Sequence, residues 1–123
     1  MLRDAGKQDK AEIYELWKQS YPNQNRNYLN FYFKNIFDKG RCIALEQDQR
    51  IISSLQLNEH ILRLRDKQLK ISYILGVSTL PDYRRRGHMR RLMESALDEA
   101  GHNHLVTLIR GFYPKLYEQF GFE

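Results

Sequence analysis

Residues Arg84–Arg86 and Gly87 stand between an apolar, strand-like run and an amphipathic helical pattern. The apolar run is Ile71–Thr79, and a short bend containing Pro81 follows it. This order brings the free N–H groups of a helix's first turn, and the positive end of its dipole, to the carboxyl end of a strand, where they suit a phosphate or pyrophosphate. The arginines add full charge and forked donors at the same place. The sequence therefore predicts an anion cradle over residues 84–90.

Length and composition indicate a single globular domain spanning residues 1–123, since 41% of the residues are hydrophobic and 28% are charged. No apolar run is long enough to cross a bilayer, and the N-terminus lacks the apolar core of a signal peptide. A lone cysteine, Cys42, cannot form an internal disulfide, so we expect a cytoplasmic protein. Much of the net charge of +5 lies between Arg84 and Arg91, which favours a local site for an acidic ligand.

The N-terminal third of the chain has a helical pattern. A very short strand at Leu2–Arg3 precedes a capping box at Asp9–Glu12, which we expect to begin the first helix. Pro22 and the asparagine-rich segment after it interrupt the pattern. A second helix, closed by Lys39–Gly40, carries an apolar stripe at helical spacing: Leu29, Tyr32, Phe33, Ile36 and Phe37. We interpret its aromatic residues as core rather than as the wall of a substrate pocket.

After Gly40 the period changes to that of strands. The sequence predicts strands at Arg41–Glu46, Arg50–Leu57 and Leu69–Thr79, with Ile61–Leu64 as a candidate extension of the second. A helix over Met89–Ala100, ended by Gly101, and a strand over Leu105–Ile109 complete a right-handed crossover with parallel strands. A short last helix bears Leu116, Tyr117 and Phe120. The fold class is thus α/β (α+β), with a mixed, mostly antiparallel sheet flanked by helices.

Two segments resemble the GNAT superfamily of N-acetyltransferases. Val77–Leu92 is similar to the acyl-CoA-binding strand, loop and helix of that superfamily, and Leu116–Phe122 is similar to its C-terminal Tyr…Gly-Phe signature. Within the glutamine/arginine-x-x-glycine-x-glycine/alanine pattern, Arg84 and Gly87 match, whereas Met89 stands where a small residue is usual. The arginine run and the tail resemble the branch that contains the enhanced-intracellular-survival aminoglycoside acetyltransferases. The superfamily adds two strands after Gly-Phe, so we expect the last two strands to be lacking here.

The resemblance implies acetyl-CoA as the acyl donor and gives the cradle a use. Backbone groups of Val77, Ser78 and Thr79 would pair with the pantetheine arm as if it were an added strand. The pyrophosphate would lie on the amides of six consecutive residues: Arg85, Arg86, Gly87, His88, Met89 and Arg90. The strand Leu69–Thr79 should diverge from Leu105–Ile109 and open a wedge for the cofactor.

The resemblance also implies a direct transfer of the acetyl group to a primary amine of a small molecule or peptide. A backbone N–H near Val77 would serve the oxyanion, and Tyr117 would protonate the departing thiolate. The alternative for Tyr117 is a core aromatic. The general base stays open between a water relay and four side chains: Glu46, Glu59, His60 and the terminal Glu123.

Other functions compete with this interpretation. A catalytically inactive acyl-CoA-binding or regulatory domain would keep the cradle without a base, and a nucleic-acid-binding module would use the same arginines on phosphates. We expect neither a nucleic-acid nor a membrane partner, and a homo-oligomer or a further C-terminal segment would complete the sheet. We expect no metal site, because the histidines and Cys42 lack ligand spacing. We expect Cys42 to be a buried, inert thiol.

Overall fold

The computed structural model describes residues 1–103 and 107–109 of the chain. In this part, strand β1 (Leu2–Ala5) leads through a 3₁₀ turn, η1 (Lys7–Asp9), into helices α1 (Lys10–Ser20) and α2 (Arg26–Asn35). A second 3₁₀ turn, η2 (Phe37–Lys39), precedes strands β2 (Arg41–Gln47), β3 (Arg50–Leu64) and β4 (Lys67–Thr79). A third, η3 (Pro81–Tyr83), then joins β4 to helix α3 (His88–Asn103), and β5 (Thr107–Ile109) follows.

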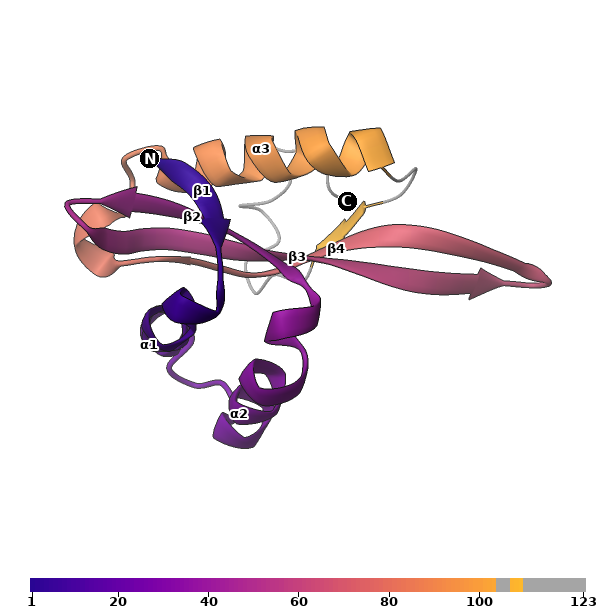
Figure 1. Cartoon of the computed structure of the whole chain (residues 1–123), viewed down its shortest axis with the longest axis horizontal. Helices are drawn as coiled ribbons and strands as arrows, with labels where there is room; N and C mark the ends of the chain where they lie inside the picture. The colour runs from indigo at the N-terminus through magenta and orange to yellow at the C-terminus, as the bar shows by residue number, and fades with distance from the viewer. Residues whose placement is uncertain (104–106, 110–123) are drawn as a thin grey trace.

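The strands form one sheet in the order β1-β2-β3-β4-β5. The first four are antiparallel to their neighbours, and β5 pairs with β4 in parallel at Ser72, Tyr73 and Ile74. This confirms the predicted mixed sheet and the parallel crossover. Figure 1 shows α3 on one face of the sheet and α1 and α2 on the other, while the outer half of the β3–β4 hairpin projects beyond the helices.

The core has a helix layer on each face of the sheet. On one side, Ile13, Leu16 and Trp17 of α1 are buried together with the aromatic residues of α2. Tyr32 and Phe33 are only 1% and 5% exposed, and both pack edge-to-face against Trp17, which confirms them as core. On the other side, the apolar stripe of α3 is fully buried: Leu92, Met93, Ala96 and Ala100.

Cys42 is also buried, and burial raises the pKa of its thiol to about 12. The Gln56 side chain donates a hydrogen bond to its sulfur. A thiol held protonated in this way is a poor nucleophile, so the interpretation of Cys42 as inert is confirmed.

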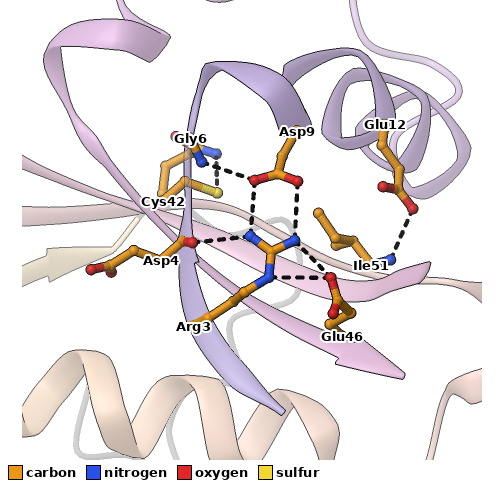
Figure 2. Close-up of polar contacts among 9 residues, drawn as sticks. Arg3, Asp4, Gly6, Asp9, Glu12, Cys42, Glu46 and Ile51 are labelled. Carbon is orange, nitrogen blue, oxygen red and sulfur yellow. Dashed lines mark hydrogen bonds and ion pairs between the residues drawn. The ribbon is translucent and has the colours of Figure 1, made fainter. Parts of the chain in front are cut away.

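The first helix does not begin as predicted. Asp9 makes no side-chain cap for α1; its carboxylate instead accepts two hydrogen bonds from the Arg3 guanidinium, at 2.9 and 3.0 Å, and one from the Gly6 amide (Figure 2). Glu12 does not reach back either, because its carboxylate accepts from the Ile51 amide of β3. The capping box is therefore wrong: a bidentate ion pair with a strand outcompetes a local cap.

One candidate boundary is confirmed, and the ends of α2 and α3 differ from the prediction. β3 continues through Ile61–Leu64 as one long strand, so the candidate extension is real. α2 ends at Asn35 and its predicted last turn is the separate η2. Gly101 does not end α3, which runs on to Asn103; one glycine costs a helix only about 1 kcal/mol, which the packing of the preceding turns can offset.

Replacing Asp9 with asparagine should lower the free energy of unfolding by about 2 kcal/mol at pH 7, because Arg3 loses its bidentate partner in a largely buried position. Hydrogen bonds from Arg3 hold the pKa of Asp9 below its usual value, so this stabilisation is present above about pH 4 and is lost as the pH falls through the lowered pKa. Urea unfolding of both proteins from pH 7 to pH 3 tests this.

The matched control is Asp38→Asn, which removes a more exposed ion pair with Lys10. It should cost less than about 1 kcal/mol. Equal losses in the two variants, or an Asp9→Asn protein whose acid sensitivity matches the wild type, would contradict the role given to Asp9.

Candidate functional site

The site begins where β4 departs from regular pairing. Ser54 pairs with Ser78 and Gln56 pairs with Leu75, so the single residue Leu55 of β3 lies opposite both Gly76 and Val77. Gly76 has φ +63°, the left-handed conformation of a glycine β-bulge. Such a bulge bends and twists its strand. The bulge therefore re-aims the last residues of β4, which are the ones predicted to face the cofactor.

Beyond the bulge, β3 is the only strand among the described residues that pairs with β4. The described pairing of β4 with β5 reaches Ile74 and Ile109, and the residues that would show whether the two strands then diverge lie outside the described part of the chain. Val77 and Ser78 are buried and Thr79 is half-buried. The predicted wedge therefore stays a prediction.

All three carbonyl groups of Val77–Thr79 already accept hydrogen bonds from side chains, that of Ser78 from the Ser53 hydroxyl at 2.9 Å. The Tyr21 hydroxyl donates to the Val77 oxygen at 2.6 Å, and Arg84 Nε donates to the Thr79 oxygen at 3.0 Å. The Leu80 amide donates to the Ile52 carbonyl of β3, so the backbone N–H and C=O of Thr79, its neighbour in the strand, point away from β3, while the Thr79 hydroxyl is hydrogen-bonded to that of Ser53. A pantetheine arm that paired with this edge would have to displace a donor to reach the carbonyl of Val77 or of Thr79.

The chain turns sharply between β4 and α3. The η3 turn is closed by a hydrogen bond from the Tyr83 amide to the Leu80 carbonyl, and Arg85 and Gly87 then both have positive φ, +63° and +83°. Nothing lies within 4 Å of the position that a Cβ would occupy on Gly87. The backbone is therefore open to a ligand at this glycine.

Helix α3 begins with donors that its own geometry leaves unsatisfied. The Arg91 amide closes the first turn of the helix by donating to the Gly87 carbonyl at 3.1 Å. Within residues 1–103 and 107–109, the amides of Arg85, Arg86, Gly87, His88 and Met89 have no acceptor. The amides of Arg85–Met89 are thus ordered and, among the described residues, not paired with the protein's own carbonyls, and they lie at the positive end of a 16-residue helix.

Side chains of the cradle differ in their surroundings. Arg85 and Arg86 are exposed, and the Arg86 guanidinium lies 5.6 Å from the centre of the Tyr83 ring. Arg90 is exposed and lies 3.8 Å from Glu94, one turn further along α3. Met89, at the position where the family pattern has a small residue, packs against the core. Its bulk is therefore directed inward, and its amide keeps the same place in the first turn.

The sequence candidates for a general base do not gather at this site. Glu46 accepts two hydrogen bonds from Arg3 in the β1–β2 corner (Figure 2). Glu59 and His60 pair with Ser72 and Ile71, which precede Val77 by five and six residues, about 15–20 Å along the strand. Glu59 and His60 therefore lie too far along the strand for a base acting at Val77, and the carboxylate of Glu46 is engaged by Arg3. Tyr117 and Glu123 lie outside the described residues.

Sequence reasoning missed Tyr21. The available signal was its spacing from Trp17, four residues earlier, which places both aromatic side chains on one face of α1. Trp17 reaches the bulge as well: a Cβ on Gly76 would lie 2.9 Å from its ring. One face of α1 therefore contacts two consecutive residues of β4.

Partial burial, followed by the positive charges of Arg91 and Arg86, holds the pKa of His88 below its usual value. Replacing Arg86 with glutamine should raise that pKa, because one of the opposing charges is removed. Titration of the His88 ring protons by NMR measures the change. The control is Arg84→Gln, since Arg84 is not among the causes of the shift; an unchanged His88 pKa in Arg86→Gln would contradict the proximity of the two side chains.

Comparison with known proteins shows the family to which this fold belongs. The family model described as the acetyltransferase (GNAT) domain matches residues 1–123. No curated protein matches the chain by sequence. No helix in the described part of the chain is long and apolar enough to cross a membrane.

Solved structures share the fold at low sequence identity. An Enterococcus faecalis protein of unknown function, described as a probable N-acyltransferase, superposes with a TM-score of 0.86 at 18% identity over all of this chain, which spans 32% of that protein. The aminoglycoside N-acetyltransferase AAC(6')-Iy in complex with CoA gives 0.76 at 16% identity, with 87% of that chain covered. The aminoglycoside 6'-N-acetyltransferase AAC(6')-IG from Acinetobacter haemolyticus gives 0.75 at 14%, with 90% covered.

Proposed function

Because the chain belongs to the GNAT acetyltransferase family, we propose that it is an acetyl-CoA-dependent N-acetyltransferase that moves an acetyl group directly to a primary amine. The observation that supports this most is the row of ordered amides at the start of α3 that have no acceptor among the described residues, under three exposed arginines. It would hold a diphosphate without rearrangement of the backbone. We treat residues 1–123 as one acetyltransferase-like domain in the cytoplasm.

Each part of the site has a role in this proposal. The amides of residues 85–90 and the side chains of Arg85 and Arg86 would hold the phosphates, and the end of β4, Val77–Thr79, would align the pantetheine arm. When bound, acetyl-CoA supplies an acyl group activated as a thioester. Tyr117 would give a proton to the leaving sulfur, and a backbone N–H near Val77 would stabilise the oxyanion.

The nature of the amine is the finer part of the proposal. Two of the similar structures are aminoglycoside acetyltransferases, and the arginine run and C-terminal motif resemble the enhanced-intracellular-survival branch. These support a small-molecule amine as the first acceptor to test. Polyamines, amino acids and peptide amines belong in the same panel.

A specific observation favours a second candidate, an inactive acyl-CoA-binding or regulatory domain. The carboxylate and imidazole candidates for a base within the described residues are held away from Val77. Such a domain would bind acetyl-CoA and release no thiol with any amine of the panel. An active enzyme would release thiol with at least one of them.

Gly87→Asp should weaken acetyl-CoA binding at least tenfold relative to Gly87→Asn. The two side chains have the same size and meet the same left-handed backbone, but only aspartate places a negative charge beside the bound diphosphate. Titration calorimetry of both variants and the wild type measures this. Equal affinity in the two variants, or a wild type that does not bind, would overturn the cradle.

Tyr117→Phe should keep the affinity for acetyl-CoA and reduce thiol release at least tenfold, because loss of a general acid affects the chemical step alone. The control is Tyr113→Phe, a nearby tyrosine outside the motif. The panel of amines is assayed with a thiol reagent. Unchanged turnover in Tyr117→Phe would assign Tyr117 to the core.

A further inference from the structure

Tyr21 links helix α1 to the end of β4 through a short hydrogen bond. It is the residue at the C-terminal end of α1, and its amide closes the last turn by donating to the Trp17 carbonyl. Its half-buried ring lies edge-on to Trp17, with 6.4 Å between the ring centres. From this position the hydroxyl reaches the Val77 carbonyl at 2.6 Å, across 56 residues of sequence.

The Val77 peptide, which Tyr21 holds, lies at the β-bulge, where the regular hydrogen-bond ladder between β3 and β4 is interrupted. At the bulge, Gly76 and Val77 together face one residue of β3, and a bulge leaves its extra residue outside the ladder. Two further contacts restore order there: Ser78 Oγ donates to the Gly76 carbonyl at 3.1 Å, and the Trp17 ring covers Gly76. The Tyr21 hydrogen bond supplies the corresponding restraint on the next carbonyl, that of Val77.

This restraint matters because oxyanion stabilisation depends on donors that are oriented before the reaction. A backbone N–H that is free to rotate must be reorganised in the transition state, and that cost reduces its contribution. The end of β4 is the segment to which we assign the thioester. A side chain that fixes one peptide of that segment therefore acts on the orientation of its neighbours.

Resting on the function proposed above, we propose that Tyr21 is a positioning residue for acetyl transfer: by holding the Val77 carbonyl, it fixes the backbone of the β4 bulge in the orientation that polarises the thioester carbonyl. The hydroxyl acts through the peptide and needs no contact with the substrate. Its removal changes the polarisation of the bound thioester without changing how strongly the nucleotide part binds.

The test compares Tyr21→Phe with the wild type and with Tyr14→Phe. The control removes a hydroxyl from the same helix, one that donates a 2.6 Å hydrogen bond to Asn30 on the exposed side and does not touch β4. Each protein is titrated with [1-¹³C]acetyl-CoA in a calorimeter, and the carbonyl stretch of the bound ligand is recorded by isotope-edited infrared spectroscopy. Hydrogen-bond donation to this carbonyl lowers its frequency, so the band reports polarisation directly and requires no acceptor amine.

We expect the wild type and Tyr14→Phe to shift the band equally. Tyr21→Phe should lose at least half of that shift, while its dissociation constant stays within about twofold of the wild type and its melting temperature stays near that of the control. A purely structural role would lower the melting temperature and leave the band of the bound ligand unchanged.

Three results would overturn the inference. An undiminished shift in Tyr21→Phe would show that the hydroxyl does not orient the donor. Weaker binding would show that Tyr21 contacts the ligand itself, and tighter binding would show that it competes with the ligand for the Val77 carbonyl. Binding by none of the three proteins is a separate outcome, which would overturn the proposed function and this inference with it.

Discussion

The rest of the proposed site depends on the amide donors at the start of α3, which have no acceptor among the described residues. Every helix leaves its first N–H groups without intrahelical partners, and most helices satisfy them with a capping side chain or with water. Here the sequence places a left-handed glycine, Gly87, and exposed arginines at that point instead. The donors keep a fixed direction because Leu92, Met93 and Ala96 of the same helix are buried against the sheet. An anion is the ligand that we propose for this geometry.

The opposite layer of the molecule determines the other end of the site. α1 packs on the β4 bulge through Trp17 and Tyr21, while the ion pair of Arg3 with Asp9 joins β1 to the turn before α1 (Figure 2). α1 is thus held at its start by a strand-to-turn ion pair and contacts β4 at its end. Because the helix is rigid over 11 residues, these two fixed points define where its aromatic side chains meet β4. In the site that we propose, the two helix layers therefore serve different parts: α3 would supply donors and α1 would shape the strand.

Much of this could be predicted from sequence, where local pattern decides the structure. The periodic apolar residues of α3 and the glycine-arginine run before it required no tertiary information. The errors arose where distant residues compete with local ones. Asp9 has the sequence of a helix cap, but β1 brings Arg3 within reach of its carboxylate. The sequence alone offers Glu46 as a candidate base, but the fold brings the same arginine to its carboxylate. The hydrogen bond from Tyr21 to Val77 could not be predicted either, since only the packing of α1 on the bulge brings the two residues together.

The central claim is that the amides at the start of α3 receive the diphosphate of acetyl-CoA, and amide NMR tests it most directly. In a ¹⁵N-labelled protein titrated with acetyl-CoA, the account predicts that the amide protons of Gly87, His88 and Met89 move downfield and show the largest changes among residues 1–103. Titration with coenzyme A lacking the acetyl group should give the same changes at these three amides. Saturation of the protein with these signals unmoved would contradict the account.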